Sequence, residues 1–95
     1  MSGPHGYTHD KAGYLRRLRL IEGQTRGIAR MVEADEYCID VLTQISAVRA
    51  ALGAVSLGLL EDHLGHCVAH AIQHGGREVD EKLDEAMAAI RRMAK

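Results

Sequence analysis

The sequence has no tryptophan and no phenylalanine, and only three tyrosines among its 95 residues. Its core must therefore be built from leucine, isoleucine, valine, alanine and methionine. A chain this short and this poor in aromatic residues buries only a modest core, and small proteins commonly compensate by forming oligomers. We therefore expect one small domain that associates with copies of itself.

The sequence also lacks segments that would direct it into or across a membrane. No apolar run approaches the roughly 20 residues of a membrane span. The N-terminal segment MSGPHGY has no apolar stretch of the kind that forms a signal peptide. Both cysteines, Cys38 and Cys67, are therefore expected in the cytoplasm, where thiols stay reduced and available to metals or redox chemistry.

The single proline lies in residues 1–9, which we interpret as a flexible N-terminal arm, and residues 10–95 are predicted to form one helical domain. Apolar residues recur there at steps of three and four, which predicts amphipathic helices. The predicted bounds are 10–33, about 36–73 and about 78–93, with Asp35 as a candidate N-cap and Gly75-Gly76 ending the second helix. The expected fold class is all-α, with three helices.

Positive charge gathers in the first predicted helix, although the net charge of the whole chain is only -1. From Lys11 to Arg30 the only acid is Glu22, whereas acids outnumber bases after Arg30. A basic segment on an acidic body suits an anionic partner such as DNA. Charge alone is equally compatible with a solvated helix face.

Cys38, His63 and Cys67 have the spacing of a divided metal site. His63 and Cys67 are four residues apart and share one face of a helix. Cys38 lies at the start of the same predicted helix, 29 residues before Cys67 or about 43 Å at roughly 1.5 Å per residue. One chain cannot bring these donors together, but two chains packed antiparallel about a two-fold axis can.

Two thiolates and one imidazole form a soft donor set. Soft thiolates select Cu(I), zinc or iron–sulfur clusters, and structural zinc normally takes four ligands, so three donors favour Cu(I). The alternative is that both cysteines are small buried hydrophobic residues. His66, His70 and His74 are interpreted as a surface band, although His5, His66 or His70 could supply a ligand and admit nickel or zinc.

Motifs for catalysis are absent from the sequence. It contains no glycine-rich phosphate loop, no serine-nucleophile motif and no HExxH motif. We therefore expect a binding protein rather than an enzyme.

These patterns carry a family resemblance. The stretch IEGQTRGIARMVEADEYCIDVLTQISAVR, residues 21–49, resembles the copper-sensitive operon repressor (CsoR) family. The stretch HLGHC, residues 63–67, continues the match at the expected distance, and Gly75-Gly76 falls at the family's loop before its last helix. The resemblance covers nearly the whole chain after the arm.

The resemblance implies an antiparallel homodimer that pairs into a homotetramer and binds double-stranded operator DNA without a helix-turn-helix motif. It also implies that Cu(I) binding lowers DNA affinity and derepresses copper-resistance genes. The family's copper ligands fall on Cys38, His63 and Cys67. The tyrosine and glutamate behind those ligands fall on Tyr37 and Glu81, and a basic DNA contact falls on Arg17, with Arg16, Arg19 and Arg30 as further candidates.

Relatives that sense nickel, cobalt, formaldehyde or persulfides leave alternatives open. The nickel class places a histidine in the arm, where this chain has Gly6, and another at the position of Cys67. The persulfide class keeps both cysteines but lacks the histidine between them, so His63 favours copper. A cytosolic copper buffer that binds no DNA is a third alternative, against which the basic first helix argues.

Overall fold

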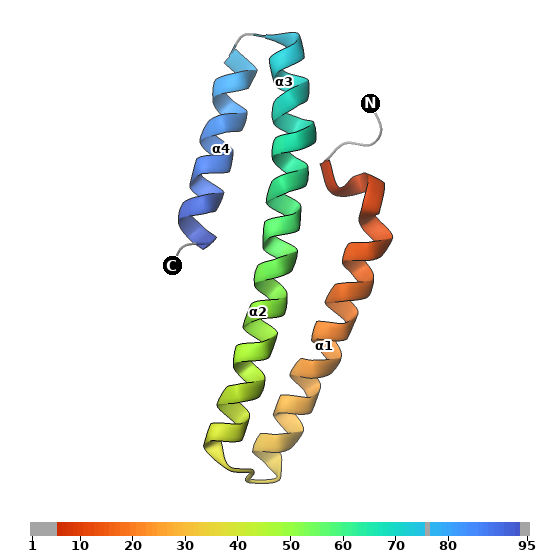
Figure 1. Ribbon diagram of the computed structural model, residues 1–95, viewed down its shortest axis with the longest axis vertical. Coiled ribbons are helices and arrows are strands. Elements are labelled where there is room, and N and C mark those ends of the chain that lie inside the picture. The colour runs from red at the N-terminus through yellow and green to blue at the C-terminus, as the bar shows by residue number, and fades with distance from the viewer. Residues whose placement is uncertain (1–5, 76, 94–95) are drawn as a thin grey trace. The chain divides into compact units, whose positions relative to one another are not determined.

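The computed structural model describes residues 6–75 and 77–93, without the side chains of Cys67, Val68 and Glu78. Within these residues all regular structure is helical, which confirms the all-α class. The elements are a 3-10 helix η1 (Gly6–Asp10), α1 (Lys11–Glu33), α2 (Cys38–Asp62), a π-helix η2 (His63–Val68), α3 (Ala69–His74) and α4 (Arg77–Met93) (Figure 1). The predicted three helices are present, the second of them as α2, η2 and α3 in succession.

The chain divides into two compact parts, and residues 12–55 form the first. Here α1 and residues 38–55 of α2 lie side by side and run in opposite directions (Figure 1). Tyr14, Ile21 and Val55 form the buried cluster, against which Val48 and Ala51 pack. These apolar side chains recur at whole-turn spacings along each helix, so that each helix turns one stripe toward the other.

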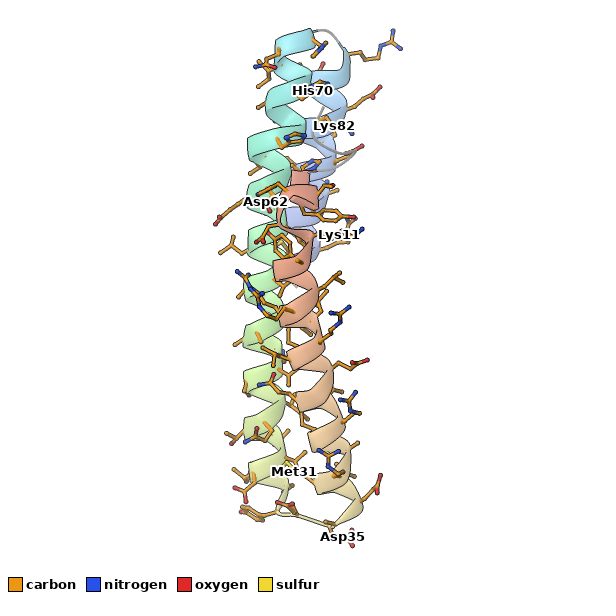
Figure 2. All side chains as sticks on the ribbon, turned by 90° about the vertical axis from the view of Figure 1, so that its right-hand side faces the viewer. Lys11, Met31, Asp35, Asp62, His70 and Lys82 are labelled. Carbon is orange, nitrogen blue, oxygen red and sulfur yellow. The ribbon has the colours of Figure 1, made fainter. Side chains whose placement is uncertain are left out.

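Asp35 shapes the turn between these helices differently from the prediction (Figure 2). Its φ of 56° is left-handed, a conformation that Asp tolerates better than most residues. The Asp35 N–H donates to the Val32 carbonyl and the Glu36 N–H to the Met31 carbonyl, each at 3.0 Å. This is a Schellman motif. Asp35 therefore ends α1, and the expectation that it caps the second helix was wrong.

The second helix begins two residues later than predicted, at Cys38. The carbonyl of Tyr37 accepts hydrogen bonds from the N–H groups of Asp40 at 3.0 Å and Val41 at 3.2 Å. Tyr37 is thus the residue that caps α2 through its backbone, and it places Cys38 at the first helical position.

The second compact part joins the N-terminal residues to those from Ser56 onward. Gly6 is buried, and a Cβ atom on it would overlap the backbone carbonyl of Asp62, so only glycine fits this approach. His9 Nδ1–H donates to the Gly6 carbonyl at 2.7 Å. Residues 6–9 of the predicted flexible arm therefore lie in a 3-10 helix, and the domain bounds stay predictions.

Gly75 ends α3, in agreement with the sequence. Its φ is 71°, and its N–H donates to the carbonyls of Ala71 at 2.8 Å and Ile72 at 3.2 Å. The chain then enters α4, which packs on both α3 and η2.

The helical run Cys38–His74 leaves much apolar surface uncovered within the chain. Its most apolar window has a mean hydropathy of 1.4, and 6% of that window is buried. By length and composition alone this run could cross a membrane. No such segment was expected from the sequence, because polar residues interrupt each continuous apolar stretch of the run. Exposed apolar side chains on α2 include Ile39, Leu42, Ile45, Leu52, Leu57 and Leu59.

Candidate metal site and basic helix face

The π-helix η2 contains His63 and Cys67 together with His66. π-helical turns are rare and occur frequently at functional sites. Residues four apart in such a turn remain neighbours along the helix axis, so His63 and Cys67 still form a local pair. The side chain of Cys67 lies outside the described residues.

The Nε2 atom of His63 is buried, and no described residue forms a hydrogen bond with it. Leaving a buried polar atom without a partner costs about 1–3 kcal/mol, so the native protein has reason to supply one. A neutral imidazole nitrogen with a free lone pair is a common metal ligand. His63 therefore fits a metal ion, and the Nε2 atom of His66 is in the same state.

Cys38 lies at the opposite end of α2, where its thiol is free and exposed. The helix is 25 residues long, begins at Cys38 and ends at Asp62, directly before His63. Within the described part of the chain, no three His, Cys, Asp or Glu side chains are close enough to hold a metal ion. Because Cys38 begins the 25-residue α2 and His63 directly follows its end, the predicted site would combine donors of two chains, and it stays a prediction.

His63 also lines an open groove of about 470 Å³ beside α4. Its charged lining residues are Glu85 and Arg92; the others are Ser56, Leu59, Leu60, Ala89 and Met93. Glu85 also lies 3.6 Å from the ammonium group of Lys82. Glu81, the predicted glutamate, is exposed on the preceding turn and does not line this groove. Glu85 lies one helical turn after Glu81 on the same face of α4, and it was not singled out from the sequence.

Three of the predicted DNA-binding residues share one exposed face of α1. Arg16, Arg19 and Arg30 are separated by three and eleven residues, close to whole helical turns, and lie opposite the buried stripe. Arg26 lies on the same face and was not among the predicted set. Its guanidinium is 3.4 Å from the Glu22 carboxylate, an exposed pair of small energetic value.

Arg17 lies at the flank of this face. Its guanidinium carbon is 5.6 Å from the centroid of the Tyr14 ring, within the range of a cation–π contact. Because Tyr14 belongs to the buried cluster, this contact gives the guanidinium a defined position on the helix. Arg16, Arg17, Arg19 and Arg30 form no ion pair with any described residue, which leaves their charges available to a partner.

A basic helix and a divided thiol–imidazole donor set are features of a metal-responsive regulator. Residues 10–92 match the family of metal-sensitive transcriptional repressors, and the chain belongs to that family. The family predicted from residues 21–49 and 63–67 is thus confirmed.

Individual relatives are named for copper and for nickel. The chain is 59% identical to the copper-sensing transcriptional repressor RicR of Mycobacterium tuberculosis, over 100% of this chain and 99% of that protein. It is similar to the crystal structure of the copper-sensing repressor CsoR with Cu(I) from Geobacillus thermodenitrificans, with a TM-score of 0.85, 47% identity, and 92% and 88% of the two chains covered. The nickel-responsive transcriptional regulator InrS is also similar, with a TM-score of 0.75, 34% identity, and 88% and 92% covered.

Proposed function

We propose that this chain is a cytoplasmic Cu(I)-responsive transcriptional repressor and not an enzyme. It binds operator DNA in the apo form and is released when Cu(I) binds, so that copper-resistance genes are derepressed. The observation that carries the proposal is the set of Cys38, His63 and Cys67, in which the Nε2 atom of His63 is buried without a partner among the described residues. The copper-sensing relatives support the choice of metal.

Cys38 of one chain and His63 and Cys67 of a second chain hold the ion in this proposal. Cu(I) is a soft ion that accepts two thiolates and one imidazole as a complete ligand set. Tyr37 supports the site from the residue before Cys38. The family resemblance places the supporting glutamate of α4 at Glu81, although Glu85 is the glutamate that lines the groove beside His63. Two-fold symmetry then creates two equivalent sites in each dimer.

The exposed apolar side chains of α2 support the assembly. Leu52, Leu57 and Leu59 are 43%, 51% and 37% exposed in the single chain, and other large apolar side chains of α2 are similarly open. Large apolar side chains left exposed in this number mark an interaction site. An antiparallel dimer that pairs into a tetramer covers it and also brings the metal donors together.

The arginines of α1 bind the operator in this proposal. Arg16, Arg17, Arg19 and Arg30 neutralise phosphates, which releases counterions and makes the affinity strongly dependent on salt. Phosphate contacts position a protein without reading bases, so sequence preference comes from a few base contacts and from DNA shape.

The packing of residues 12–55 connects the two sites. Tyr14 belongs to the cluster that joins α1 to α2, and the same ring holds the Arg17 guanidinium. A movement of α2 as Cys38 closes on the partner's donors is therefore passed to the arginines of α1. The bound state then presents those arginines in an arrangement that no longer matches the duplex.

Replacing Arg17 tests the DNA-binding part of this proposal. Arg17→Ala is expected to weaken operator binding and to reduce the slope of log affinity against log salt by about one for each phosphate that is no longer neutralised. Arg17→Lys keeps the charge and should keep the slope. Fluorescence anisotropy with DNA from upstream of the chain's own gene measures both quantities over a salt series.

The control is Arg91→Ala, which removes the same charge from an exposed position on α4. It should leave affinity and slope close to the wild-type values. Equal reductions in the two alanine variants would show that total charge, rather than the face of α1, determines binding.

A nickel-responsive repressor is the second candidate, because the fold is shared with InrS. Two residues argue against it. Cys67 stands where the nickel class has a histidine. Gly6 stands at the position in the N-terminal arm where the nickel class has its other histidine. The contact of Gly6 with the Asp62 backbone leaves no space even for a Cβ atom. The donor set therefore favours Cu(I).

A further inference from the structure

His70 and His74 form a pair of imidazoles that the copper-sensing proposal does not use. They lie one turn apart in α3, where His70 is half-buried and His74 is exposed. His70 is labelled in Figure 2. Their ring centroids are 4.3 Å apart, and the ring planes are inclined at 41°. Both rings are thus on one side of the helix, and the His74 ring is exposed to solvent.

The hydrogen bond of His74 fixes which ring nitrogen is available. Its Nδ1 atom is 2.9 Å from the backbone carbonyl of His70, and a carbonyl can only accept a hydrogen bond. Nδ1 therefore carries the proton in the neutral ring, and the lone pair is on Nε2. Histidines that ligate metals almost always donate their other N–H to a carbonyl or carboxylate in this way, which fixes the tautomer and the orientation of the ring.

The position at the end of a helix favours a cation. His74 is the last residue of α3, and the preceding residues from Cys38 onward are helical. Carbonyl groups at a helix C-terminus carry partial negative charge that stabilises nearby positive charge. Arg77, three residues later at the start of α4, carries a positive charge that would act against this stabilisation.

We propose that His70 and His74 bind a divalent transition-metal ion such as Ni(II) or Zn(II), at a site separate from Cys38, His63 and Cys67. Imidazole suits these ions, whereas the thiolates select softer Cu(I), so the two sites differ in the metals that they prefer. The described residues supply no third donor to this pair, and water completes the coordination. The inference does not depend on the copper-sensing proposal.

The experiment uses the full chain with Cys38→Ser and Cys67→Ser, which removes both thiols as competing ligands. Isothermal titration with Ni(II), and separately with Zn(II), is expected to give one bound ion per chain. Replacing His74 by Ala in this background should weaken metal binding more than about tenfold. Even the loss of a residue that hydrogen-bonds to a metal ligand lowers metal affinity roughly 10- to 100-fold. Replacing both His70 and His74 should abolish this binding.

His9→Ala is the matched control. His9 also donates its Nδ1–H to a backbone carbonyl, that of Gly6, but it contacts no second imidazole within the described residues. Its replacement should leave Ni(II) and Zn(II) binding unchanged. His74 is exposed, so the His74→Ala protein should keep the helical circular dichroism of its parent. Unchanged affinity and stoichiometry in the variant lacking both His70 and His74 would overturn the proposal.

Discussion

Dimers assembled from one Cys38→Ser chain and one Cys67→Ser chain are expected to bind one Cu(I) ion tightly. In the divided site, Cys38 of each chain serves the partner's His63 and Cys67. The mixed dimer therefore has one site with all three donors and one site that lacks both thiolates. If each site instead belonged to a single chain, both sites of the mixed dimer would lack one thiolate.

The homodimers provide the comparison. A dimer of Cys38→Ser chains, or of Cys67→Ser chains, lacks one thiolate at both sites. Its Cu(I) affinity should fall more than about 100-fold, because even the loss of a residue that hydrogen-bonds to a metal ligand lowers metal affinity roughly 10- to 100-fold. The mixed dimer is obtained by giving the two chains different tags and purifying them together. Competition with a Cu(I) chelator under reducing conditions then measures the Cu(I) affinity of the mixed dimer and of the two homodimers. Failure of the mixed dimer to recover any tight site would contradict an intersubunit arrangement.

His63→Ala is expected to remove the copper response but to preserve any response to persulfide. Cys38 and Cys67 remain, and two thiols are sufficient for sulfur chemistry, whereas Cu(I) loses its imidazole ligand. We expect the Cu(I) affinity to fall more than about 100-fold, and operator release by Cu(I) to disappear at concentrations that saturate the wild type. Release of labelled operator DNA by Cu(I) and by a persulfide donor distinguishes the two effects.

His66→Ala is the appropriate control for this variant, because His66 lies in the same π-helix and its Nε2 atom is also buried without a partner among the described residues. If His63 alone is the ligand, His66→Ala retains the copper response. Loss of the copper response in His66→Ala but not in His63→Ala would show that His66, and not His63, is the imidazole ligand.

The sequence predicted the helices well because their local signals agree with one another. The first helix was expected at residues 10–33 and spans Lys11–Glu33. The last was expected at about 78–93 and spans Arg77–Met93. Apolar periodicity set their interiors, and the glycine with positive φ at position 75 set the end of α3.

Two local features were beyond the sequence patterns. Asp35 is a good N-cap residue, but a short polar side chain also tolerates the left-handed conformation that ends a helix, and the latter role prevailed. The π-helix η2 was not expected. A step of four residues, such as that from His63 to Cys67, is compatible with an α-helical turn and with the wider π-helical turn, so the spacing does not distinguish them.

The candidate site was predictable only in its donors. Residue types and spacing singled out Cys38, His63 and Cys67 as candidate donors, and that set stays a prediction. The burial of the His63 Nε2 atom and the place of Glu85 in the groove beside it depend on packing against α4, which no local pattern encodes.

The most direct test of copper sensing compares the affinity of apo and Cu(I)-loaded protein for the same operator DNA at one fixed salt concentration. Couplings between two ligands typically amount to about 1–3 kcal/mol, so the operator affinity is expected to fall by roughly 5- to 150-fold when Cu(I) binds. Because the coupling is reciprocal, saturating DNA should weaken Cu(I) binding by the same factor. Equal affinity of the apo and Cu(I)-loaded protein for the operator would contradict the account.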